Sequence, residues 1–343
     1  MTASESSFIG LAKQTAKGTP NITDEDFTYM LFTQGSLAAA SVNLPLDPEV
    51  GGGALLRDVN KVGVMSGGRL SFIPRPKSLG FAMLGMTGAV NTTDNTDGSF
   101  THDFTLASDQ FDAPYWTGRQ DIGGLQGEQL QDLRFNSLAL AWRGARFVTG
   151  EIGLVGGLPA PVSTAAWNAL AAVDGGPQFI APLGTIELPT ATALKVIAGS
   201  FVASAAIPME EQWIVGSYQP DGFDITQRAY ALQMAVKIED GDLYKQMMYD
   251  PASGSAWVAE AMREADINIS FDSPVEAATG VPYSFSIAAN GASGAGANIV
   301  WTAQPIPLSA GRQIILNITG TFLADPAAGD PITLSLTNQE ASY

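Results

Sequence analysis

The chain of 343 residues has no cysteine and a single histidine. The lack of cysteine excludes disulfides and thiolate metal sites, and one histidine excludes metal centres built from several imidazoles. Charged residues make up only 15% of the chain, and 34 acidic residues against 17 basic ones leave a net charge of −17. Such a surface repels nucleic acid, because affinity for phosphate comes largely from Lys and Arg.

Long apolar runs and targeting segments are also missing. No run is long enough to span a membrane, and we expect no secretion signal, because the first 20 residues lack a basic region followed by an apolar core. What is abundant is apolar residues, at 45%, together with 37 glycines and 20 prolines. This composition favours a strand-rich, turn-rich fold with a real core, either two domains or one large β domain.

The chain is organised around residues 57–88, which read as strand, break, helix and stop. Strand-type residues up to Phe72 contain Gly67-Gly68, which predicts a bulge. Residues 77–86 then space their apolar side chains as one face of a helix, and Gly88 is a helix-stopping glycine.

A second stretch, residues 218–254, repeats this order with a long strand, a polar break and a short helix at 242–249. Upstream, Gly35-Ser36 matches Gly199-Ser200 at an offset of 164. These matches predict a duplication. We therefore expect a first unit with an N-terminal arm at 1–159, a linker at 160–183 and a second unit at 184–343.

The remaining segments are assigned from their patterns. A short strand is predicted near Phe8, a long extended stretch at 27–44, and a second short helix at 256–264. Turns or loops are expected at 91–98 and 111–131. The predicted strands in the rest of the chain are 100–106, 133–142, 147–155, 195–207, 223–238, 267–271, 283–287, 299–302, 313–322 and 332–336.

Motifs for chemistry are scarce. There is neither a nucleophile elbow nor a dinucleotide-binding fingerprint. His102 lies in a strand pattern and is expected to be structural. The acidic clusters, such as Glu210-Glu211, fall at predicted turns, where carboxylates are usually solvated. We expect no enzymatic activity, no cofactor and no metal.

The stretches SFIGLAKQTAKGTP, GSLAAASVNLPLDPEVGGGALLRD and GGRLSFIPRPKSLGFAMLGMTG resemble the tail tube proteins of long-tailed bacteriophages. The runs FTHDFTLASDQFDAPYWTGRQ and SLALAWRGARFVTGEIGLVGGL resemble the continuation of that pattern. The likeness covers roughly the first 160 residues best. In this family a β-sandwich with one flanking helix contributes long hairpins to a ring, and stacked rings form a tube that carries DNA.

The resemblance implies a mainly β fold with a few short helices: two tandem tail-tube-type β-sandwich or β-barrel units, each with a long hairpin and a flanking helix. It implies a structural virion protein of a siphovirus tail that assembles with itself and serves DNA ejection. Its implied partners are a tape measure protein, a tail terminator and DNA that passes without specific binding, with no membrane. The alternative is a non-enzymatic β-sandwich adhesin or another virion binding protein.

Two surfaces follow from this reading. The long connections at 46–57 and 209–222 are expected to contact the adjacent ring, through the residues Val50, Leu55, Leu56, Trp213, Ile214 and Val215. Alternate residues of the long hairpins should line a polar or acidic lumen, and Asp224, Thr226 and Arg228 are one of two alternating sets that could do so. A duplicated chain predicts a trimeric ring with pseudo-sixfold symmetry, and an unrelated outer domain predicts a hexamer.

Overall fold

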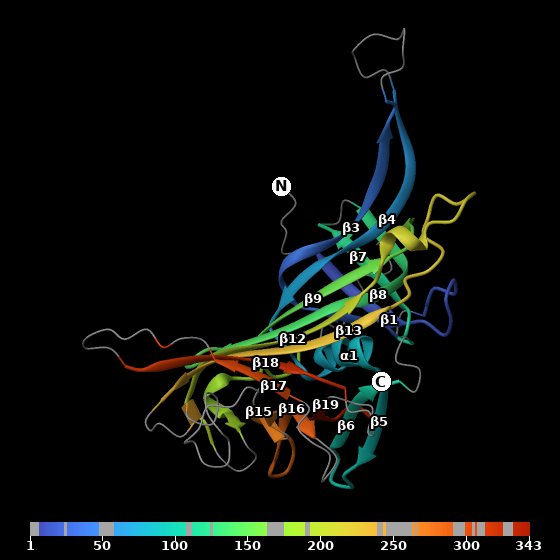
Figure 1. The fold of residues 1–343 in the computed structure, drawn as a ribbon. Helices are drawn as coiled ribbons and strands as arrows, with labels where there is room; N and C mark the ends of the chain where they lie inside the picture. The colour runs from blue at the N-terminus through green and yellow to red at the C-terminus, as the bar shows by residue number, and fades with distance from the viewer. Residues whose placement is uncertain are drawn as a thin grey trace.

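The computed structural model describes residues 7–23, 26–47, 58–107, 112–123, 126–162, 175–188, 193–238, 243–244, 263–264, 266–290, 299–303, 306, 313–324 and 332–343. Two antiparallel sheets and one α-helix account for most of these residues (Figure 1). The mainly β fold class expected from composition is therefore confirmed.

The larger sheet contains 13 strands and includes both halves of the chain. Its main path runs β14-β17-β18-β13-β12-β8-β7-β1-β2, and the branch β8-β9-β4-β3 leaves it at the long strand β8, which also pairs with β10. The bounds of these strands are β1 Phe8–Lys13, β2 Thr28–Met30, β3 Phe32–Pro45, β4 Val59–Phe72, β7 Trp116–Ile122, β8 Gln126–Arg143, β9 Thr149–Gly156, β10 Pro159–Val162, β12 Val196–Ala206, β13 Gln227–Lys237, β14 Arg263–Glu264, β17 Ile299–Ala303 and β18 Ile315–Phe322.

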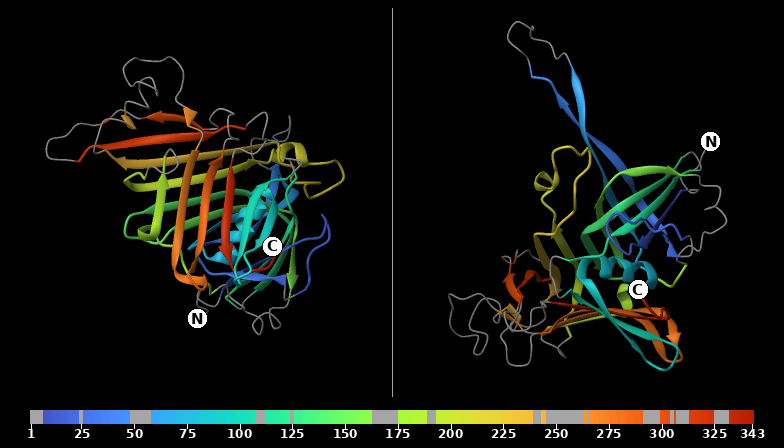
Figure 2. Two further views of the ribbon diagram at one scale, coloured as in Figure 1. Left: turned by 90° about the horizontal axis from the view of Figure 1, so that it is seen from below. Right: turned by 90° about the vertical axis from the view of Figure 1, so that its right-hand side faces the viewer.

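The smaller sheet has six strands in the order β11-β15-β16-β19-β6-β5, and it too mixes the halves. Seen from below, its strands cross those of the larger sheet (Figure 2). The bounds are β5 Gly88–Asp94, β6 Phe100–Leu106, β11 Gly184–Glu187, β15 Asp266–Ala278, β16 Val281–Asn290 and β19 Thr333–Asn338. Two short 3-10 helices, η4 Ala181–Leu183 and η5 Met209–Gln212, lie in connections.

Helix α1, Pro76–Thr87, lies between the two sheets (Figure 1). Proline in its first turn is suited to the fixed φ of a helix start. Gly88 ends it in the left-handed region at φ 96°, donating its backbone N–H to Leu84 O. Ten of its residues are buried. The amphipathic face read from the sequence is thus part of a helix that is enclosed on nearly all sides.

The core fills the space between the sheets and around the helix with aromatic and aliphatic side chains from both halves. Trp116, Phe135, Phe201, Phe271 and Phe285 are all almost fully buried. Trp116 and Phe135 meet edge-on, and Phe271 stacks on Phe285. Each such side chain stabilises the fold by roughly 1.5–3 kcal/mol relative to an exposed one.

Three predictions of secondary structure are wrong. Residues 111–131 are not a loop, because β7 and the start of β8 lie there. The turn expected at 91–98 is shorter, since β5 continues to Asp94. Arg263–Glu264 form strand β14 rather than the end of a helix. The rest of that expected helix lies outside the described residues, as does most of 242–249, of which residues 243–244 are helical.

Strand β7 explains the largest of these errors. Arg119, Gln120 and Asp121 are all buried in succession, so the strand shows no alternation of apolar and polar residues. Gln120 donates its amide N–H to Glu128 Oε2 at 2.9 Å, and the Arg119 guanidinium lies 3.9 Å from the centre of the Phe27 ring. Buried polar groups with such partners are compatible with a strand, but a hydrophobic pattern cannot reveal them.

The bulge predicted at Gly67-Gly68 is also wrong, because both glycines pair with β3 and with β9 without a break in register. The irregular points of the β3–β4 ladder lie instead between Phe32 and Gln34 and between Val42 and Asn43. The helix predicted at 77–86, the hairpin at 133–155 and the five closing strands after residue 266 are confirmed.

Candidate functional site

The two long hairpins pair in the same register. In β3–β4, Leu37 lies opposite Gly68, and in β12–β13, Phe201 lies opposite Leu232. Both strands therefore correspond after one shift of 164 residues, the offset that relates Gly35-Ser36 to Gly199-Ser200.

The next two strands continue this correspondence. Gly68 pairs with Leu154 of β9, and Leu232 pairs with Gly320 of β18, a shift of 166 for the third strand. Leu154 pairs in turn with Phe135 of β8, and Gly320 with Trp301 of β17. The four-strand order β3-β4-β9-β8 is thus matched by β12-β13-β18-β17.

The two four-strand blocks are joined edge to edge. Strand β8 pairs with β12 from Ser137↔Ser204 to Arg143↔Ala198, without a break in register. The last strand of the first block therefore binds the first strand of the second, and the pair forms one continuous sheet within a single chain (Figure 1).

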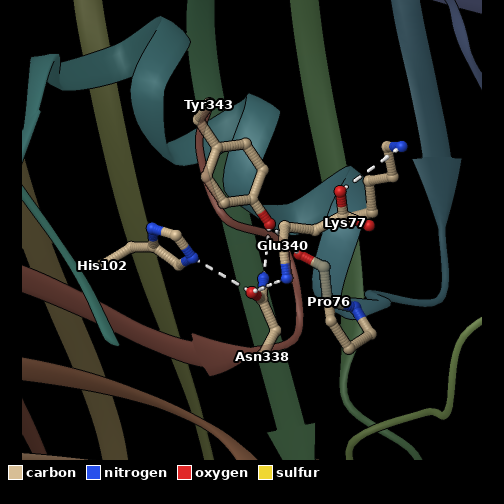
Figure 3. Close-up of polar contacts among 6 residues, drawn as sticks. All are labelled: Pro76, Lys77, His102, Asn338, Glu340 and Tyr343. Atoms are coloured by element: carbon tan, nitrogen blue, oxygen red, sulfur yellow. Dashed lines mark hydrogen bonds and ion pairs between the residues drawn. The ribbon is translucent and has the colours of Figure 1, made fainter. Parts of the chain in front are cut away.

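The smaller sheet joins the halves a second time, where β6 pairs with β19. At this seam His102 Nε2 lies 3.0 Å from Asn338 Oδ1, and its Nδ1 lies 2.9 Å from the Thr92 hydroxyl (Figure 3). Because an amide oxygen can only accept, the ring carries its proton on Nε2 and accepts at Nδ1. Tyr343 packs edge-on against the ring at a centroid distance of 4.8 Å.

The C-terminal residues connect this seam to helix α1. Tyr343 donates its hydroxyl to Pro76 O at 3.0 Å and accepts from Asn338 Nδ2 at 2.6 Å (Figure 3). Glu340 forms an ion pair with Lys77 at 3.6 Å. Burial lowers the pKa of His102, so the ring is neutral near pH 7. The single histidine is a structural residue, as its strand context predicted.

The larger sheet has one face turned away from the helix and the second sheet. From β4 through β9, β8, β12 and β13 to β18, alternate residues point to this open face, and their registers place them in continuous rows. The members of these rows are mostly small or neutral: Gly67, Ser71, Thr149, Gly153, Ser137, Ala139, Ala141, Ala198, Ser200, Val202, Ser204, Ala229, Ala231, Gln233, Ala235, Asn317, Thr319 and Thr321.

Charge is sparse on the open face. In these rows the charged side chains are Arg69, Glu151, Arg143 and Lys237, and Arg69 and Glu151 form an ion pair at 3.2 Å. The net charge of −17 is therefore not concentrated here.

The three residues of the predicted lumen set do not share one face. Asp224 and Thr226 are exposed and alternate with Phe223 and Ile225, which are both 2% exposed. Asp224 and Thr226 both precede β13, which begins at Gln227.

Arg228 lies on the other face of β13, the one covered by helix α1. Its guanidinium donates to Thr87 O at 2.8 Å and to Asp112 O at 2.7 Å. Thr87 is the last residue of α1, so a cation here complements the negative end of the helix. Burial lowers the pKa of Arg228, which still remains protonated. No local pattern indicates this contact, because it joins segments far apart in the chain.

The described residues of the predicted inter-ring set lie in the connection after η5. Ile214 and Val215 are exposed, at 51% and 107%. Trp213 instead packs its ring over Gly63 of β4, and Val64 N–H donates to Tyr218 O at 2.7 Å. The connection of the second hairpin thus contacts the first hairpin. Val50, Leu55 and Leu56 lie outside the described residues.

Neither a metal centre nor a membrane span is found in the described part of the chain. It contains no group of three or more His, Asp or Glu residues that could hold a metal ion. It also contains no helix with the length and apolar character needed to cross a bilayer.

Comparison with known proteins gives one family. The family described as phage tail tube protein matches residues 4–337, nearly the whole chain. A search of the curated proteins finds no match.

Proposed function

The chain belongs to the phage tail tube protein family and is a structural protein of the virion tail, and on this premise we propose that three copies close each ring of the tube. The observation that carries the proposal is the matched register of β3-β4-β9-β8 and β12-β13-β18-β17. In this proposal the two units of the chain, 1–159 and 184–343, are copies of one another. Each chain therefore supplies two of the six equivalent blocks of a ring. Stacked rings form the conduit through which DNA is ejected.

The alternative of an unrelated outer domain after residue 184 is less compatible with the sheet order. Strands β12, β13, β17 and β18 all belong to the same sheet as β3, β4, β8 and β9, whereas a decorative domain has its own separate sheets. Pairing head to tail with further copies removes the open edges of this sheet, and a closed rotation gives a ring.

The open face of the larger sheet is the channel wall in this proposal. A wall of hydroxyl, amide and small side chains offers DNA few fixed charges to bind, so the phosphate backbone slides past it. This wall carries hydroxyl and amide groups among small apolar side chains, and it is close to neutral rather than acidic. Arg228, on the helix-covered face, has a structural role in this scheme.

Lysine substitutions test the wall directly. Replacing Ser200, Gln233 and Thr319 with Lys puts three cations on neighbouring open-face positions, and DNA ejection should slow at low salt and recover as salt is raised. A control variant carries Val275→Lys on the smaller sheet, where Val275 is 49% exposed, and should eject normally. Unchanged ejection of the triple variant at low salt contradicts the assignment.

Contacts between rings are made by the ends of the hairpins. The β3–β4 hairpin projects beyond the rest of the molecule (Figure 2), and the segment with Val50, Leu55 and Leu56 connects its strands. Ile214 and Val215 are exposed apolar residues that follow Trp213, which packs over Gly63 of this hairpin. Together they bind the adjacent ring. The tape measure protein and the tail terminator are the further partners of the assembled tube.

Negative-stain electron microscopy of the purified protein tests the proposal as a whole. Tubes or stacked rings are the expected result. Uniformly dispersed particles under all assembly conditions contradict it and favour the alternative, a β-sandwich adhesin or another virion binding protein.

A further inference from the structure

The junction between the two blocks of one chain also specifies the junction between chains. Strand β8 uses one edge twice: Leu133 pairs with Trp116 of β7, and from Ser137 onward the same edge pairs with β12. On the corresponding edge of its counterpart β17, only Ile299 and Val300 pair with a strand, which is β14. The following residues of β17 pair with β18 on one side, and no described residue pairs with them on the other.

The matching free edge belongs to β3, the counterpart of β12. Within the described residues β3 pairs with β4 alone, and Ala38 to Pro45 are all exposed. One amide of this edge is occupied, because Leu37 N–H donates to Gln120 Oε1 at 3.2 Å. The edge is therefore open from Ala39 onward.

We propose that the free edge of β3 pairs with the end of β17 in a second copy of this chain, with Ala40 directly opposite Thr302. This rests on the proposed ring and adds its register. The pair is the counterpart of Ser204↔Ser137 within the chain.

The register follows from the matched ladders. Ser204 corresponds to Ala40 by the shift of 164. Strand β8 has a bulge between Phe135 and Ser137 that β17 lacks. The offset between corresponding residues of β8 and β17 is therefore 166 at Phe135 and 165 from Ser137 onward. Gly153↔Ser137 then corresponds to Thr319↔Thr302.

Side-chain direction agrees with this register. Ser204 and Ser137 both point to the open face, and so do Ala40 and Thr302 by their pairing with Met65 and Thr319. Because Leu37 N–H points to the free edge, Ala39 N–H does too. Ala40 and Thr302 are then a non-hydrogen-bonded pair, the closer kind, with Cα atoms about 4.5 Å apart.

Disulfide trapping tests the register, and the absence of native cysteine leaves no competing thiol. A Cα separation of about 4.5 Å is within disulfide range. Purified Ala40→Cys chain is mixed with Thr302→Cys chain, assembled, oxidised and run on a non-reducing gel. Covalent dimer is expected from the mixture and not from either variant alone. The double variant should give species up to a closed trimer.

Two matched controls fix the interpretation. Ser137→Cys with Ser204→Cys in one chain should form an intrachain bond and run as a monomer, which shows that the counterpart geometry supports a disulfide. Ala38→Cys with Thr302→Cys keeps the face but shifts the register by two residues, to roughly 7–8 Å, and should give no dimer.

The outcomes separate the register from the ring. If rings are visible but only the shifted pair cross-links, the register is wrong and the ring stands. If rings are visible and neither pair cross-links, the chains join through other edges. If neither rings nor cross-links form while the intrachain control does, both proposals are overturned.

Discussion

The hairpins β3–β4 and β12–β13 begin alike and end differently. Their ladders match up to Val42↔Gly63 in the first and its counterpart Ala206↔Gln227 in the second. At that point the first hairpin has a bulge and then continues pairing to Pro45↔Val59, whereas pairing in the second stops. The second chain segment leaves the ladder through η5 and places Trp213 over Gly63.

Under the proposed duplication, this difference shows how two copies of one unit can be given separate tasks. The shared part of each ladder contributes to the sheet and to the proposed channel wall. Past the shared part, one copy extends away from the molecule, and the other folds back to support it. The bulge and the packed tryptophan therefore mark the boundary between common framework and specialised ends.

The largest expected effect is on the free energy of unfolding, and it distinguishes alanine substitutions at two equivalent glycines, Gly35 and Gly199. Gly35 has φ +123°, and an added Cβ would lie 2.0 Å from Arg69 O. Gly35→Ala should lower the free energy of unfolding by roughly 3 kcal/mol, because a backbone carbonyl in the ladder cannot move aside. Urea unfolding of the monomer measures this.

Gly199→Ala is the matched comparison. Its Cβ would meet the buried Trp142 ring at 2.7 Å, and a side chain can shift where backbone cannot. A smaller loss, about 1–2 kcal/mol, is expected. Equal losses at both positions contradict the difference in backbone strain between the hairpins.

The contact between the hairpins is broken by Gly63→Val. A Cβ at Gly63 would lie 2.4 Å from the Trp213 ring, so this variant should lose about 1–3 kcal/mol of stability. Trp213→Ala in the same chain should restore part of that loss, because the clash disappears. A double-mutant cycle measures the coupling, and additive effects show that the two hairpins do not interact here.

The exposed end of the second hairpin should matter for assembly and hardly at all for folding. Ile214→Ser with Val215→Ser should change monomer stability by no more than about 0.5 kcal/mol and slow tube formation, followed by light scattering. Val275→Ser removes another exposed apolar side chain, one that is 49% exposed on the smaller sheet, and should assemble normally. Normal assembly of the double variant removes this segment from the inter-ring contact.

The smallest expected effect is at the β6–β19 seam around His102, where the stability of the fold is compared between pH values. Because burial lowers the pKa of His102 in the fold, the unfolded chain takes up a proton first as pH falls below the ordinary value of about 6.5. The contribution of neutral His102 is therefore complete above that pH and is lost as pH falls through the folded pKa. His102→Gln should flatten the dependence of stability on pH in this range. An unchanged slope assigns it to other groups.

Much of the architecture could be predicted from local pattern. Alternating strands, helix α1 with its Gly88 stop and the offset between Gly35 and Gly199 were all readable in the sequence. Each depends on residues near one another in the chain, where periodicity and turn chemistry operate.

The assembly surfaces were less accessible, for two physical reasons. Strand partners such as β8 and β12 are chosen by tertiary packing, which no local pattern encodes. Net charge also says how many acids a chain carries and nothing about where they lie, so a strongly acidic chain can present a nearly neutral open face. Arg228 illustrates the same limit, since its partners at Thr87 and Asp112 are more than 100 residues away.

The rotational symmetry of averaged end-on images of rings tests the central claim most directly. Two copies of one block in each chain predict threefold repetition around a nearly sixfold inner wall, because the two hairpins pair in the same register along their shared ladder and diverge past it. True sixfold repetition, with six identical outer lobes, would contradict the account, since each chain would then supply only one block to the ring.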